Sequence, residues 1–259
     1  MFAVARNAFA DLGTGFRMHR VWLALAQEDI DEQHRRTTLG PIWMLLNYLI
    51  YIITFMMVFG RATIPNFIAY FSVGMLVFMF LQEIMTRSVG LFRQERAFIA
   101  GTTMPLTVYV MRMAMQSVIR TSYAVLGCFA VLLVSGTPMT MAWIWSIAGL
   151  IEALLVTVPT IILFAMAGAY FPDMQFIITN LIRVSMFLTP IFWVKAPGAR
   201  ENLSRFNPLT YFLDTVRDPI VFGTVPVHAF IVCAVIIAAT WLLAIVLLGK
   251  YRRDIVFLL

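Results

Sequence analysis

Charge is scarce in this sequence. Of its 259 residues, 12% are Asp, Glu, Lys or Arg, whereas 61% are hydrophobic. A typical soluble domain has about 25% charged and about 45–50% apolar residues, so this chain lacks the polar surface that would cover a soluble globule. Its high hydrophobicity equally excludes intrinsic disorder. The surplus apolar surface must face lipid, which predicts a membrane protein that crosses the bilayer several times.

Residues for metal binding and covalent chemistry are also few. The two cysteines, Cys128 and Cys233, lie in apolar runs and form neither a disulfide framework nor a CxxC pair. His19, His34 and His228 are far apart and lack the spacing of metal ligands. No GxSxG, HExxH or Walker A motif occurs. We therefore expect no metal, no cofactor and no catalysis in this chain, and any energy for transport must come from a partner or an ion gradient.

The apolar residues gather in long runs. A helix needs about 20 mostly apolar residues to cross roughly 30 Å of hydrocarbon. The qualifying runs cover residues 41–59, 66–82, 106–135, 141–169, 174–193 and 227–249. The sequence therefore predicts one all-α integral membrane domain over residues 1–259, with six transmembrane helices.

The basic residues predict the orientation of these helices. Eleven Lys and Arg residues precede the first run, lie between the second and third, or follow the sixth; five lie in the other connections. Because basic loops stay in the cytoplasm, both termini are predicted to be cytoplasmic. The net charge of +6 is then a topology signal, and we expect no binding to nucleic acid.

Three segments outside the runs have helical or docking character. Residues 16–36 mix apolar and charged side chains, which predicts an amphipathic helix on the cytoplasmic membrane surface; a merely solvated helix is the alternative. Residues 1–15 contain no continuous apolar run, so no cleaved signal peptide is expected. The loop at residues 83–104 could dock a partner.

The last long connection, residues 195–226, is too long for a turn and too apolar for a free loop. Within it Phe212, Val216 and Ile220 repeat every four residues, as on one face of a helix. This pattern predicts short helices that dip back into the outer leaflet, where protein or a cavity must cover them.

Ionisable residues inside predicted spans are the first functional candidates, because they are costly in lipid. Arg112, Gln116 and Arg120 follow an i, i+4, i+8 spacing that places them on one helical face. Guanidinium groups bind phosphate through paired hydrogen bonds, so this polar face is a candidate phosphate site. In the alternative interpretation, both arginines extend to lipid headgroups.

Two further ionisable residues are predicted to lie near the middle of the membrane. Glu152 and Arg183 belong to the consecutive fourth and fifth runs, which should be antiparallel helices. Pairing would reduce the cost of burying both charges. We therefore expect an ion pair, which could fix helix register or contact substrate.

Two helical faces combine aromatic and polar side chains. Sugars stack their C–H faces on aromatic rings and bond polar groups through their hydroxyls, so such faces could line a path for glycans. Ordinary helix packing and interfacial aromatic belts are the alternative. The candidate residues are Trp43, Asn47, Tyr51 and Thr54 in the first run, and Thr179, Arg183 and Phe187 in the fifth.

One motif carries a family resemblance. Asp29-Ile30 is followed by RRTTLGPIW at residues 35–43, entering the first run. This pattern resembles the membrane subunit of ABC-2-type polysaccharide exporters, the group of O-antigen, capsule and teichoic-acid permeases. Supporting motifs are residues 95–99, Met104-Pro105, Tyr170-Phe171-Pro172-Asp173 and Asn207-Pro208.

The chain departs from the family pattern at two places. Pro172 stands where many members have arginine, so no role is assigned to a basic residue there. Asn47-Tyr48 stands where many members have a proline after the tryptophan of the first span. Neither departure changes the expected fold.

The resemblance implies a homodimer in the inner (cytoplasmic) membrane, surrounded by membrane lipids and bound to two copies of a separate ATPase that holds Mg-ATP. Residues 16–36 would be the interface helix, residues 91–100 the coupling helix, and residues 208–223 the periplasmic gate. The first and fifth spans of both protomers would line the channel. Candidate coupling residues are Phe92, Arg93, Glu95, Arg96, Phe98 and Ile99.

The implied substrate is a lipid-linked polysaccharide, with O antigen as the leading choice and diphosphate contacts at Arg112, Gln116 and Arg120. A capsular polysaccharide or another glycan or lipid exporter is the alternative within the family. An integral-membrane enzyme acting on polyprenyl-linked sugars would need clustered acids or histidines at one membrane face, and a passive channel would need no docking loop.

Overall fold

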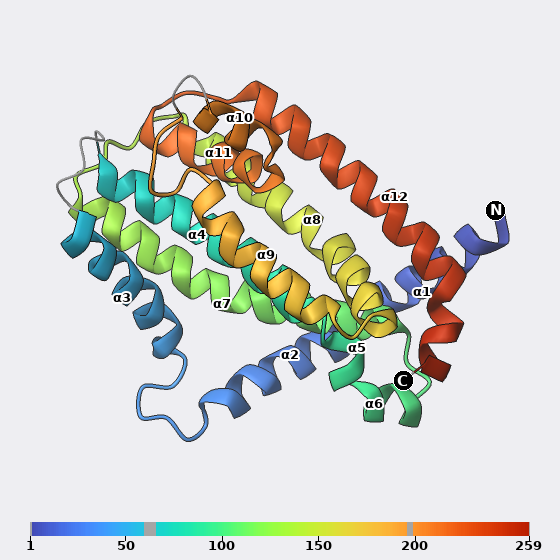
Figure 1. Cartoon of the computed structure of the whole chain (residues 1–259). Coiled ribbons are helices and arrows are strands. Elements are labelled where there is room, and N and C mark those ends of the chain that lie inside the picture. Colours follow the sequence, from blue (N-terminus) through green and yellow to red (C-terminus); the bar gives the residue numbers. More distant parts are fainter. Residues whose placement is uncertain (1, 60–65, 196–198, 259) are drawn as a thin grey trace.

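In the computed structural model, which describes residues 2–59, 66–195 and 199–258, every regular element is an α-helix (Figure 1). This agrees with the predicted all-α class. Four helices are long and apolar enough to cross a membrane: α4 (Phe67–Ser88), α7 (Leu106–Val134), α8 (Trp143–Tyr170) and α12 (Val227–Leu258). They correspond to the predicted runs 66–82, 106–135, 141–169 and 227–249.

The other two runs form shorter helices. α3 (Ile42–Phe59) has 18 residues and α9 (Met174–Leu188) has 15. At 1.5 Å per residue they are about 27 and 22 Å long, less than the hydrocarbon thickness. The predicted helix 174–193 ends five residues early because Thr189 precedes Pro190 and adopts extended backbone, φ −84° and ψ 136°.

The helix α4 lies at the centre of the bundle. Its apolar window is 78% buried, against 17–39% for the other three long helices. It packs against α7, α8 and α9, and against α11 (Pro208–Val221). Because α7, α8 and α12 surround this core, their outer faces carry the apolar surface that lipid would cover.

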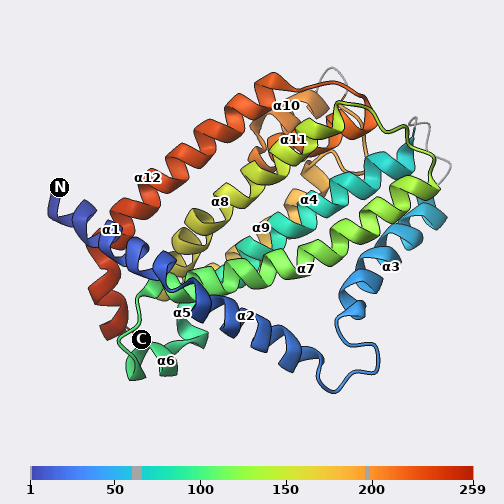
Figure 2. The same ribbon diagram turned by 180° about the vertical axis from the view of Figure 1, so that it is seen from behind.

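The base of the bundle is the end at which both chain termini lie, and α1 (Phe2–Arg17) and α2 (His19–His34) cross it (Figures 1 and 2). The single helix predicted at 16–36 is thus the second of two, separated at Met18 with φ −79° and ψ 31°. The sequence predicted no element for α1, which packs on α12 and α7.

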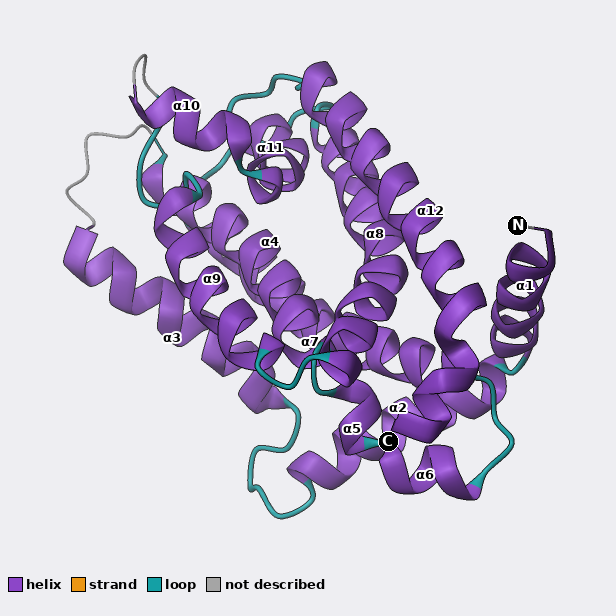
Figure 3. Cartoon of the chain, turned by 45° about the vertical axis from the view of Figure 1, so that its right-hand side comes forward, coloured by secondary structure: helices purple, strands orange, loops and turns teal. Residues whose placement is uncertain are grey.

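The predicted coupling helix at 91–100 is two short helices at the base, α5 (Leu91–Gln94) and α6 (Arg96–Gly101), with a break at Glu95. At the far end lie α10 (Ala199–Phe206) and α11, beside α12 (Figure 3). The α11 helix begins where the Asn207 side chain accepts a hydrogen bond from the Leu209 N–H at 3.0 Å, with Pro208 in the first turn. Of the predicted apolar stripe, Phe212 and Val216 are buried and Ile220 is half-buried on this helix, whereas its position in the outer leaflet stays a prediction.

Two glycines let α8 touch neighbouring backbone. A Cβ at Gly149 would lie 2.8 Å from backbone atoms of Thr215 in α11, and a Cβ at Gly168 would lie 1.9 Å from the carbonyl oxygen of Val89. Only glycine fits such contacts. They fix α8 against the far-end helix α11 and against the connection from α4 to α5.

Candidate functional site

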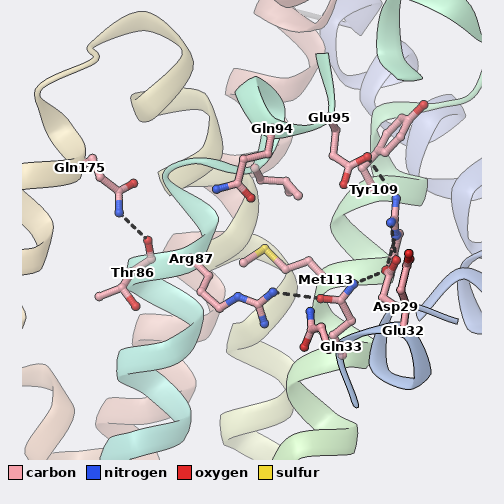
Figure 4. Close-up of a pocket in the computed structure, with 13 residues that line it drawn as sticks. Asp29, Glu32, Gln33, Thr86, Arg87, Gln94, Glu95, Tyr109, Met113 and Gln175 are labelled. Atoms are coloured by element: carbon pink, nitrogen blue, oxygen red, sulfur yellow. Dashed lines mark hydrogen bonds and ion pairs between the residues drawn. The ribbon is translucent and has the colours of Figure 1, made fainter. Parts of the chain in front are cut away.

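A cavity of about 540 Å³ opens at the base, where α2, α4, α5, α7 and the start of α9 converge (Figure 4). Its wall is mainly polar. The charged residues of the wall are Asp29, Glu32, Arg87, Glu95 and Arg112.

Arg112 joins three elements in this wall. Its Nε and Nη2 donate to the two carboxylate oxygens of Asp29 at 2.5 and 2.6 Å, and its Nη1 donates to Glu95 Oε2 at 3.1 Å. Such a bidentate pair is stronger and more directional than a single ionic contact. The pair with Asp29 fastens α2 to α7, and the hydrogen bond to Glu95 fastens α7 to the break between α5 and α6.

Gln116 and Arg120 continue the network along the same face of α7. Gln116 donates to Asp29 and accepts from Arg87 at 3.2 Å and from Arg120 at 3.1 Å. Glu83 lies 3.0 Å from Arg87 and 2.8 Å from Arg120. The predicted alignment of Arg112, Gln116 and Arg120 is therefore confirmed, and both arginines turn into protein rather than toward lipid headgroups.

The charges in this network balance. Arg87, Arg112 and Arg120 contribute three positive charges. The carboxylates contribute three negative charges: Asp29 and Glu95 pair with Arg112, and Glu83 pairs with Arg87 and Arg120. A diphosphate would have to displace these carboxylates. The role of Arg112, Gln116 and Arg120 in binding substrate diphosphate thus stays a prediction, and the arrangement gives it no surplus positive charge. The sequence singled out Asp29 as part of the family motif but predicted neither Asp29 nor Glu83 as a partner of these arginines, although Glu83 and Arg87 have the i, i+4 spacing of a helical ion pair.

The predicted ion pair between Glu152 and Arg183 is wrong. Glu152 interacts with Cys233 of α12, whereas Arg183 is exposed on α9 and forms no ion pair in the described part of the chain. The prediction assumed that two residues at a similar depth in the membrane would meet. They do not meet, because Glu152 faces α12 and α9 packs mainly against α4.

Both predicted glycan-contacting faces are accessible. Trp43, Asn47, Tyr51 and Thr54 are exposed on α3, while Tyr48 and Ile52 on its opposite face are buried. On α9, Arg183 and Phe187 are exposed, and Thr179 is half-buried with its hydroxyl donating to the Gln175 carbonyl at 2.7 Å. Their role as channel lining stays a prediction.

The candidate coupling residues separate into three groups. Phe92 and Ile99 are buried and anchor α5 and α6 in the core. Glu95 belongs to the network through Arg112. Arg93, Arg96 and Phe98 point outward, with Phe98 60% exposed. The exposed group forms a basic and aromatic surface at the base.

A second charged cluster, which the sequence did not single out, lies at the far end. Arg217 is 2% exposed; it donates to Asp214 at 2.7 Å and to the Pro190 carbonyl at 2.6 Å, and its guanidinium lies 4.1 Å from the centre of the Tyr70 ring. Lys195 also pairs with Asp214. The cluster thus joins α11, α4 and the segment after α9. The pattern DxxRD at 214–218, inside an apolar helical stripe, is the signal that could have revealed it.

Asp218 borders this cluster, 3.4 Å from Arg217. Burial, and then the nearby charge of Asp214, raises the pKa of Asp218 to about 6. Its carboxylate therefore changes charge within the mildly acidic range.

Comparison with known proteins gives two matches. Residues 20–221, well over half of the chain, match the sequence model of a family described as ABC-2 type transporter. The O-antigen export system permease protein RfbA of Myxococcus xanthus is 22% identical over 214 residues, which cover 75% of this chain and 78% of that protein.

Proposed function

Because this chain belongs to the ABC-2 type transporter family, we propose that it is the permease subunit of an ATP-driven exporter of a lipid-linked polysaccharide, with O antigen as the substrate. Family membership makes it a multi-pass membrane transport subunit with an ABC ATPase as partner. The choice of O antigen draws support from the name of the Myxococcus relative, whose identity to this chain is 22%.

In the proposed arrangement the base faces the cytoplasm. The short helices α3 and α9 complete six spans, since thinning of the bilayer or a neighbouring helix can accommodate a short apolar segment. In a homodimer in the inner membrane, the exposed polar and aromatic faces of α3 and α9 from both protomers would border the path of the glycan. The helices α10 and α11 would form the outer gate.

The observation that carries the proposal is the link from the exposed surface of α5 and α6 to the membrane helices. Arg93, Arg96 and Phe98 offer a surface for two copies of a separate ATPase that binds Mg-ATP. Glu95, between these residues, pairs with Arg112 of α7, which also holds Asp29 of α2. A displacement of α5 and α6 would therefore reach α7 and α2 through direct ionic contacts.

The test uses a strain that lacks this chain and retains its ATPase. A photo-crosslinking residue at Phe98 should capture the ATPase, whereas the same residue at Phe206, which is 85% exposed at the far end, should not. The wild-type chain should restore glycan on the cell surface. Capture at Phe206 alone, or ATP hydrolysis by the purified chain alone, would contradict the proposal. If the wild-type chain restored capsule instead of O antigen, the proposed substrate would be wrong and the proposed transport role would stand.

A further inference from the structure

The helix α1 has an outward face rich in arginine and phenylalanine. Arg6, Phe9, Gly13, Phe16 and Arg17 lie within about 100° of one another around the helix axis at 100° per residue. All five are exposed, Phe9 by 60% and Phe16 by 43%. The match to the ABC-2 family begins at residue 20, so this face lies outside the region that the family shares.

The opposite face of α1 is fixed to the bundle. Ala8, Asp11 and Leu12 are buried. Asp11 accepts hydrogen bonds from the backbone N–H of Thr107 at 3.1 Å and from its hydroxyl at 2.6 Å, and lies 3.5 Å from Arg252. Asp11 is also the only acidic residue of α1, so the outward face carries no negative charge.

These contacts set the depth of α1. Thr107 belongs to the first turn of α7, and Arg252 lies near the end of α12. Basic residues at the end of a span mark the headgroup level. The helix runs across the base, with the N-terminus projecting beyond α12 (Figures 1 and 2). The outward face therefore belongs to a helix at the level of the membrane boundary that packs against the last span.

We propose that the outward face of α1 binds anionic phospholipids of the leaflet at the base. Arginine attracts acidic headgroups, and phenylalanine inserts between them and the acyl chains, as in helices that lie in a membrane surface. Neither Arg6 nor Arg17 takes part in an ion pair within the described residues, so both guanidinium groups are available to phosphate. This proposal does not depend on the glycan substrate.

The experiment places a spin label on the outward face of the complete protein in vesicles. Gly13 is the labelling site, because a Cβ there would meet nothing within 4 Å; Gly101 of α6 has the same property and is the matched control. Both native cysteines are buried. The vesicles contain phosphatidylcholine alone or with phosphatidylglycerol. Collisions of the label with oxygen report lipid, and collisions with a water-soluble nickel chelate report water.

With phosphatidylglycerol, the label in G13C should gain oxygen collisions and lose nickel collisions, while the label in G101C should stay in water. Each arginine near an anionic surface increases the affinity for the membrane by about five-fold. The variant R6Q/R17Q in the G13C background should therefore weaken the phosphatidylglycerol dependence by about 30-fold.

Three results would overturn the proposal. A label at position 13 that stays in water at every phosphatidylglycerol content shows no lipid contact. A label shielded from both reagents shows that a second copy or another protein covers the face. Equal immersion in phosphatidylcholine alone shows apolar anchoring without recognition of charge.

Discussion

The contact between Asp29 and Arg112 yields the sharpest prediction. Asp29 accepts hydrogen bonds from three donors, Nε and Nη2 of Arg112 and the side-chain amide of Gln116. The substitution D29N leaves one acceptor oxygen, so at least one donor then faces an NH2 group. The charge attraction that holds α2 on α7 is lost as well.

The expected cost follows from the burial of the pair. The side chains of Arg112 and Asp29 are 15% and 18% exposed, so solvent screens the pair only in part. Loss of a hydrogen bond to a charged group costs about 1.5–3 kcal/mol. We expect D29N to weaken the docking of α2 by about 2 kcal/mol, which is about a 30-fold larger opening equilibrium.

Hydrogen exchange of the α2 backbone amides in the reconstituted protein measures this opening. D29N should raise exchange along α2 by about 30-fold, and stimulation of the partner ATPase by the permease should fall in parallel. The matched control is D31N, because Asp31 is exposed on the same helix and has no ion pair within the described residues. Equal exchange in D29N and D31N, or a change below about three-fold in D29N, would refute the reasoning.

Three further predictions concern α8 and the far end. G168A should lower the stability of the protein by about 2 kcal/mol or more in thermal unfolding, because its Cβ would lie 1.9 Å from a backbone carbonyl oxygen, whereas G13A, with nothing within 4 Å of its Cβ, should not lower it. R217Q should cost about 1.5–3 kcal/mol in the same assay because it removes a charge-assisted hydrogen bond to Asp214, which then keeps Lys195 as its ion-pair partner; R205Q, at an exposed residue, is the control, and equal melting temperatures would contradict this prediction. Because the pKa of Asp218 is raised in the folded protein to about 6, its contribution to stability is full below about pH 4 and is lost as pH rises through 6. The substitution D218N should therefore reduce the fall of the melting temperature between pH 4 and pH 6, and an unchanged slope of melting temperature against pH would contradict this prediction.

The long apolar runs predicted the four long helices well, because length and apolar composition are local properties. The end of α9 at Leu188 could also have been predicted from local sequence, because Pro190 follows two residues later. The helix α1 was missed for another reason. Its buried residues, Ala8, Asp11 and Leu12, form no apolar run, and their burial depends on α7 and α12, which are distant in the sequence.

In the candidate site, too, local features could be predicted and contacts between distant parts of the sequence could not. The spacing of Arg112, Gln116 and Arg120 correctly placed them on one face of α7. Their partners could not be read from spacing, because Asp29 lies 83 positions from Arg112 and belongs to α2. Knowledge of helix depth likewise failed for Glu152 and Arg183, since an ion pair also requires both side chains to face each other around their helix axes.

The glycines of α8 have a mechanical consequence. Gly149 meets the backbone of α11 and Gly168 meets the backbone beside α5, and 19 residues separate them, about 28 Å along a helix. In both contacts the nearest atoms of the neighbour belong to its backbone, which cannot change rotamer to absorb a displacement. Pro159 lies between them and is the one place in this stretch where the helical hydrogen bonding is interrupted. We therefore expect a shift of the α4–α5 connection to reach the far-end helix along α8, with bending concentrated at Pro159.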